Sequence, residues 1–95
     1  MSDLIDAAVA TLNEKSGGSF DGSAKFVITG EGTIMLDNAG ARAGDEDADV
    51  TMTADADTFR EIIEGDLNPT TAFMSGRLGI DGDMGQAMKL ASTLA

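Results

Sequence analysis

Carboxylates are the only abundant side chains in this sequence that could bind an ion or exchange a proton. The chain has 17 acidic residues, no histidine and no cysteine. A Ser-His-Asp or Cys-His arrangement is therefore impossible, and so is a zinc site made of the usual nitrogen and sulfur ligands. This composition excludes the common hydrolase and thiol mechanisms. We expect a protein that is not an enzyme and that uses no metal and no cofactor.

Two acidic clusters and one glycine pair are the remaining candidates for ion or nucleotide binding. Residues 45–49 read Asp-Glu-Asp-Ala-Asp, and residues 81–83 read Asp-Gly-Asp. Neither cluster has the loop length and terminal glutamate of an EF-hand calcium site, so we interpret both as solvated turns. Residues 30–32, Gly-Glu-Gly, lack the third glycine and the following helix of a dinucleotide fingerprint. We interpret this segment as a hairpin turn.

The net charge of -11 restricts the partners of this protein. Nucleic-acid binding depends on lysine and arginine that displace counterions from phosphates, and the six basic residues here are scattered along the chain. We therefore expect no nucleic-acid partner. The same charge opposes contact with anionic membranes, so we expect no stable membrane insertion. Two explanations of the acidity stay open: adaptation to high salt, and an ordinary acidic cytoplasmic protein.

Length and hydropathy indicate one domain over residues 1–95, with a single modest core. No apolar run approaches the roughly 18 residues that a membrane span needs. The first residues are acidic rather than basic, which predicts neither a secretory signal nor a mitochondrial transit peptide. We expect a cytoplasmic protein.

The first half of the chain predicts one helix and then strands. Apolar residues recur at helical spacing between Ser2, a candidate N-cap, and Gly17. Residues 24–29 and 33–37 read as two strands of a hairpin, residues 41–43 as a brief edge strand, and residues 50–54 as an alternating strand.

In the second half of the chain, helices surround one last strand. Thr58-x-x-Glu61 has capping-box spacing, and Asn68-Pro69 is a second helix start. Residues 77–81 alternate like a strand, and Asp83 can cap a final helix. That helix carries one apolar stripe: Met84, Ala87, Met88, Ala91 and Leu94. The order of elements predicts an α+β fold with helices gathered on one sheet face.

Residues 68–90 contain a series of motifs in a distinctive order. The series is Asn68-Pro69-x-x-Ala72-Phe73, then Gly76-x-Leu78-x-Ile80-x-Gly82, then Met84-x-x-Ala87-Met88-Lys89-Leu90. From about residue 50 to residue 90 the chain resembles the sterol carrier protein 2 family. The resemblance implies a mostly antiparallel five-stranded sheet with helices packed on one face. It also implies an apolar cavity between the two layers that accepts fatty acids, acyl-CoAs or sterols.

Position in the family motif suggests which residues form the wall of that cavity. The candidates are Phe73, Met74, Leu78, Ile80, Met84 and Met88, followed by Phe59 and Ile63. Methionine side chains are flexible and polarizable, so they can fill a space or yield it to ligands of different shape. We predict noncatalytic binding and transfer of a lipid or fatty-acyl ligand.

Two alternatives stay open at this point. The same apolar residues could form a closed core instead of a cavity wall. The domain could also be an accessory module that keeps the fold and pairs through its apolar helical face, either with a partner such as an acyl-CoA enzyme or with a second copy of itself.

Overall fold

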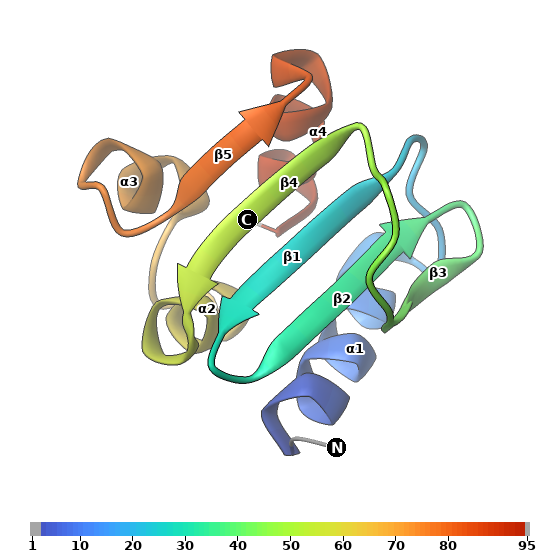
Figure 1. The fold of residues 1–95 in the computed structure, drawn as a ribbon, viewed down its shortest axis with the longest axis horizontal. Helices are drawn as coiled ribbons and strands as arrows, with labels where there is room; N and C mark the ends of the chain where they lie inside the picture. The colour runs from blue at the N-terminus through green and yellow to red at the C-terminus, as the bar shows by residue number, and fades with distance from the viewer. Residues whose placement is uncertain (1–2, 95) are drawn as a thin grey trace.

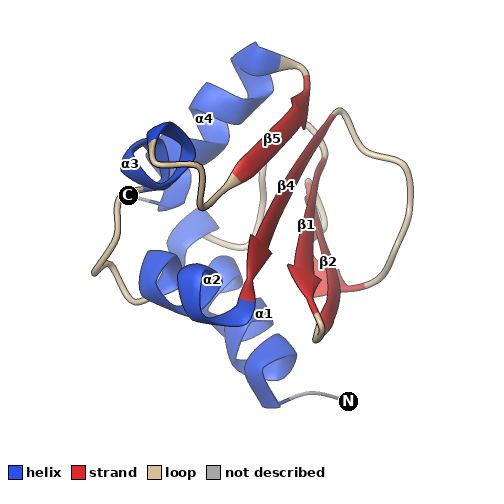
Figure 2. Cartoon of the chain, turned by 60° about the vertical axis from the view of Figure 1, so that its left-hand side comes forward, coloured by secondary structure: helices blue, strands red, loops and turns tan. Residues whose placement is uncertain are grey.

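A five-stranded sheet carries four helices on one of its faces in residues 3–94, the part of the chain that the computed structural model describes (Figures 1 and 2). The elements in chain order are α1 (Asp3–Ser16), β1 (Ala24–Thr29), β2 (Gly32–Asp37), β3 (Gly40–Ala43), β4 (Val50–Asp55), α2 (Ala56–Ile63), α3 (Pro69–Met74), β5 (Gly79–Gly82) and α4 (Met84–Leu94). The predicted α+β class and the helices on one sheet face are confirmed.

The strands lie in the order β3-β2-β1-β4-β5. β1 and β4 pair in parallel, whereas the β1–β2, β2–β3 and β4–β5 pairs are antiparallel. The sheet is therefore mixed, with the mostly antiparallel character that was expected. The parallel pair arises because the chain leaves the edge strand β3 and returns to the centre of the sheet at β4 (Figure 1).

The loop between β3 and β4 carries the acidic cluster of residues 45–49 and covers one apolar side chain. Met35 is almost fully buried, yet it does not belong to the main core cluster. Its sulfur accepts a hydrogen bond from the backbone N–H of Glu46 at 3.4 Å. The loop therefore packs on the face of the sheet opposite the helices, and its charged side chains face outward.

The core fills the space between the sheet and its helices, with large buried side chains from α1, α2 and α4. Alternate residues of β1 and β4 point toward the helices, with Phe26 beside Met52 in the parallel register. The ring of Phe26 lies 5.6 Å from that of Phe59 on α2, a tilted aromatic pair. The other large buried side chains of this cluster are Ile5, Leu12, Phe20, Ile28, Ile34, Leu36, Val50, Ile62, Ile63, Leu78, Leu90 and Leu94.

The helix starts were predicted with mixed success. Asn68 and Asp83 act as predicted, because each side chain accepts a hydrogen bond from the first turn of the helix that follows. The capping-box assignment to Thr58 is wrong. Asp55 is the N-cap of α2 and accepts from the backbone N–H of Thr58 at 2.7 Å, which lowers the pKa of Asp55. The other predicted cap, Ser2, lies outside the described residues.

The predicted apolar stripe of α4 splits into two faces. Ala87, Leu90 and Leu94 are buried against the core. Met84 and Met88 are 53% and 70% exposed, respectively. Five apolar positions at helical spacing therefore mark two adjacent surfaces, of which only one faces the core.

Candidate functional site

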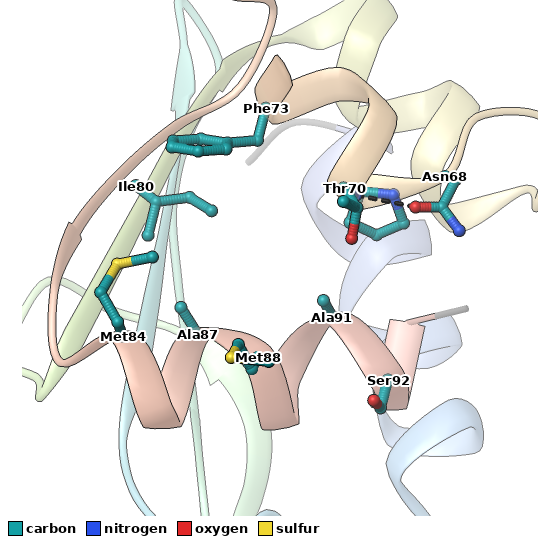
Figure 3. Close-up of a pocket in the computed structure, with 10 residues that line it drawn as sticks. Asn68, Thr70, Phe73, Ile80, Met84, Ala87, Met88, Ala91 and Ser92 are labelled. Carbon is teal, nitrogen blue, oxygen red and sulfur yellow. Dashed lines mark hydrogen bonds between the residues drawn. The ribbon is translucent and has the colours of Figure 1, made fainter.

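An open cavity of about 340 Å³ lies between α3, β5 and α4, at the edge of the sheet (Figure 3). Its lining residues are Asn68, Pro69, Thr70, Phe73, Ile80, Met84, Ala87, Met88, Ala91 and Ser92. The lining contains no charged side chain, in a protein whose net charge is -11. An uncharged wall of this kind suits a hydrocarbon better than an ion.

The wall from α3 is held by the cap at its start. The Oδ1 atom of Asn68 accepts from the backbone N–H groups of Thr70 at 2.8 Å and Thr71 at 3.4 Å. Pro69 follows at the first helical position, where its missing N–H loses no hydrogen bond. One turn later, Phe73 projects from α3 toward Ile80 (Figure 3). The Asn-Pro motif thus sets the direction in which the Phe73 ring points.

The walls from β5 and α4 are set by a tight turn between these two elements. Ile80 pairs with Met52 across the β4–β5 ladder and is half-buried. At Gly82 the backbone has a φ of 110°, and a Cβ atom there would collide with the carbonyl oxygen of Asp49. Only glycine fits this conformation and this close approach. The turn directs α4 back along the cavity.

The cavity has an apolar end and a polar end (Figure 3). Phe73, Ile80 and Met84 gather at the apolar end, and Asn68, Thr70 and Ser92 lie toward the other. Between them α4 presents Ala87, Met88 and Ala91, of which the two alanines leave room because their side chains are small. The lining therefore changes from apolar to polar along the length of the cavity.

Several apolar side chains of the wall are unusually accessible to solvent. Phe73 is 43% exposed, and the exposed fractions of Met84 and Met88 are larger still. Single exposed apolar residues are common on protein surfaces, but a contiguous group around a concavity marks a binding surface. The exposure of these residues therefore points to an apolar ligand or partner.

The eight candidate residues from the sequence fall in three places. Phe73, Ile80, Met84 and Met88 line the cavity. Phe59, Ile63 and Leu78 are buried in the core. Met74 is 80% exposed and lines neither this cavity nor the second one described below. The structure thus brings half of the candidate set together at one site.

The polar end of the cavity was not anticipated as part of a site. Asn68 and Pro69 were interpreted as a helix start and as part of the family motif but not as cavity residues, and Thr70 and Ser92 were given no role. Ala87 and Ala91 belonged to the predicted stripe of α4, but their contribution is the space that they leave empty. Ala91 follows Met84 by seven residues and Met88 by three. This helical spacing is the sequence signal that could have placed Ala91 on the same wall as the two methionines.

A second cavity, of about 320 Å³, lies between α1 and α2 and is more polar. Its lining residues are Asp3, Leu4, Ala7, Thr11, Arg60, Ile63 and Glu64. Ile63 therefore reaches a cavity wall, although a different one from the wall that Phe73 forms. Charged side chains at three of seven lining positions make this cavity a poor site for a hydrocarbon.

Residues 3–94 contain neither a metal-binding cluster nor a membrane-spanning helix. In that range no group of three or more acidic, histidine or cysteine side chains is arranged to hold a metal ion. No helix in the same range combines the length and the apolar character needed to cross a bilayer.

Comparison with known proteins identifies the family. Residues 8–95 match the SCP-2 sterol transfer family. The chain belongs to this family. Two solved structures of sterol carrier proteins from Aedes aegypti share the fold. The complex of sterol carrier protein 2 with palmitate superposes with a TM-score of 0.79 at 22% identity, covering 100% of this chain and 97% of that one. Sterol carrier protein 2 like 2 gives a TM-score of 0.76 at 20% identity, with 94% of each chain covered.

Curated relatives of this SCP-2 family member are much longer proteins. Hydroxysteroid dehydrogenase-like protein 2 of Xenopus laevis is 35% identical over 102 residues, which cover 99% of this chain and 24% of the relative. The protein of the same name from Danio rerio is 44% identical over 79 residues, which cover 75% of this chain and 19% of the relative. The chain thus spans about a quarter or less of the length of these relatives.

Proposed function

We propose that residues 1–95 act as one noncatalytic domain that binds and transfers a lipid, with the hydrocarbon part in the cavity between α3, β5 and α4. The observation that carries this proposal is an uncharged cavity with an exposed apolar rim in a member of the SCP-2 sterol transfer family. Fatty acids, acyl-CoAs and sterol-like molecules are the ligand classes to consider, since a family neighbour from Aedes aegypti forms a complex with palmitate.

The size of the cavity supports reversible binding. A methylene group needs about the space of a water molecule, roughly 30 Å³, so 340 Å³ holds about eleven methylenes. At about 0.8 kcal/mol for each methylene removed from water, a full cavity gains about 9 kcal/mol. Association costs about 4 kcal/mol or more, which leaves about 5 kcal/mol or less and a dissociation constant of about 0.2 mM or weaker. A carrier must also release its ligand, and this range permits release.

Catalysis has no support in the chemistry of the wall. The only hydroxyl groups of the lining belong to Thr70 and Ser92, and the lining has neither an acid nor a base to activate them. Both hydroxyls would therefore serve as hydrogen-bonding groups for a lipid head.

A second function is favoured by one observation. Phe73, Met74, Met84 and Met88 are large, apolar and exposed together near α3 and α4. Met74 lies outside the cavity lining, so the apolar surface extends beyond what a small ligand would cover. An accessory module that docks on another chain, such as a partner enzyme, or on a second copy of itself would use such a surface.

Native mass spectrometry of protein purified from cells separates these two functions. We expect lipid to co-purify, and we expect the delipidated protein to take up added octan-1-ol in a one-to-one complex. Met88→Trp should reduce uptake because the larger ring stands at the cavity wall. Met74→Trp is the matched control, since Met74 is also an exposed methionine but lies outside the cavity lining. A delipidated protein that binds no hydrocarbon and forms a stable dimer or heterocomplex would refute the carrier function.

A further inference from the structure

We propose that this cavity selects lipids whose head group carries no charge, such as alcohols, esters, amides or sterols, over fatty-acid anions and acyl-CoA. This inference rests on the proposed lipid-binding function and narrows its ligand class. The observations that lead to it are the neutral polar end of the cavity, the pairing of the nearby cations and the charge of the whole protein.

The polar end offers neutral hydrogen-bonding groups. Oδ1 of Asn68 is already used by two backbone N–H groups of α3, so the side chain presents its NH2 group as a donor. Thr70 and Ser92 contribute two solvent-exposed hydroxyls, and within residues 3–94 neither hydroxyl is used in a hydrogen bond to another protein group. A hydroxyl can both donate and accept. This set therefore matches a lipid hydroxyl, ester or amide.

The cations of the surrounding elements are paired elsewhere. Arg77, just before β5, has an Nη2 atom 2.7 Å from Oε2 of Glu61. Lys89, next to Met88 on α4, donates to the backbone carbonyl of Asp21 at 3.1 Å and lies 3.4 Å from its carboxylate. Proteins that recognise carboxylates or phosphates usually direct an arginine or lysine at them. Here both candidates are engaged away from the cavity lining.

The charge of the protein disfavours an anionic head as well. With 17 acidic and 6 basic residues, the field around the molecule repels anions. An ionised carboxylate would also lose part of its hydration without gaining a cation in return. An uncharged head group avoids the repulsion and pays a much smaller desolvation cost, and it can still form hydrogen bonds with the polar end.

A comparison of octan-1-ol with octanoate tests this selectivity, because the two ligands share one tail length. NMR titration of the delipidated protein at neutral pH and low salt should show octan-1-ol binding about tenfold more tightly. The difference in affinity between the two ligands should become smaller in about 0.5 M NaCl, since salt screens the repulsion between octanoate and the acidic protein. Octanoate that binds as tightly as octan-1-ol or more tightly would overturn the inference and leave lipid binding intact. If neither ligand binds, the proposed function fails, and this inference fails with it.

A charge introduced at the polar end should reverse the preference. Ser92→Lys places an ammonium group beside the expected head position, so octanoate should gain affinity relative to octan-1-ol. Thr53→Lys is the matched control, because this substitution adds the same charge at a different place. Thr53 is an exposed residue of β4 that lines neither cavity. An equal gain of octanoate affinity in both variants would refute the placement of the head group at Ser92.

Discussion

Replacing Ala91 by leucine should shorten the hydrocarbon tail that the cavity accepts. Ala91 lies on α4 and faces the cavity between its apolar and polar ends (Figure 3). Leucine adds three carbon atoms to the side chain, which need about 30 Å³ each. The substitution therefore fills about 90 Å³ of the 340 Å³ available, roughly a quarter of the cavity.

The loss of affinity follows from the methylenes that no longer fit. Three methylenes at about 0.8 kcal/mol each amount to about 2.4 kcal/mol, so a ligand that fills the cavity should bind up to about 60-fold more weakly. A short ligand that occupies only part of the cavity should lose little. The fold should tolerate the change because Ala91 is only partly buried and leucine is a good helix former.

Titration with linear alcohols of increasing length measures this effect. For the unmodified protein, affinity should rise with each carbon and level off near the capacity of the cavity. For Ala91→Leu the plateau should come about three carbons earlier. Ala10→Leu is the control, because Ala10 is an exposed position of α1 that lines neither cavity. A loss of equal size for octan-1-ol and undecan-1-ol, or no loss for either, would refute the assignment of this cavity as the tail site.

Two further predictions concern stability. Phe59→Ala removes a buried ring that packs against Phe26 and should cost about 3 to 5 kcal/mol of unfolding free energy, whereas Phe73→Ala, at an exposed wall position, should cost about 1 kcal/mol or less. Urea denaturation compares the two, and equal costs would contradict the division between core and wall. Hydrogen bonds from Arg42 hold the pKa of Asp37 below its ordinary value of 3.8. Asp37 should therefore stabilise the protein relative to Asp37→Asn above about pH 3.8, and this advantage should disappear as the pH falls through the lowered pKa. Denaturation midpoints of the unmodified protein and of Asp37→Asn, measured across this pH range, test this. A difference between the two midpoints that does not change with pH would refute the reasoning.

Local patterns were sufficient to predict nearly every element of the fold. The alternation in residues 24–29 coincides with β1, and the weak signal around Ala41 marks a real edge strand. The one misassigned helix start shows the limit of such patterns. Asp55 and Thr58 both precede the apolar residues of α2 and both belong to cap-forming types. Thr58 is buried instead, because packing against the core selects which of the two positions starts the helix.

Only half of the candidate cavity residues predicted from the sequence line the cavity, and the reason is similar. Apolar character alone does not distinguish a residue that fills the core from one that lines an opening. Phe59 and Phe73 illustrate this, since both follow a helix start by a few residues, yet one is buried against Phe26 and the other is exposed at the cavity. The difference comes from the position of each helix relative to the sheet. α2 packs against the ends of the inner strands β1 and β4, whereas α3 lies outside the edge strand β5 (Figure 1).

By itself, the sequence determined the α+β class, the order of elements, the family and the absence of histidine and cysteine chemistry, because these depend on residue types and on spacing within short segments. Only the tertiary structure decided where the opening lies. It brings the start of α3, β5 and one face of α4 together at the sheet edge, with Ala91 leaving space and Ser92 and Asn68 supplying a neutral polar end. Such a cavity depends on distances between segments that are far apart in the chain, and no local pattern encodes those distances.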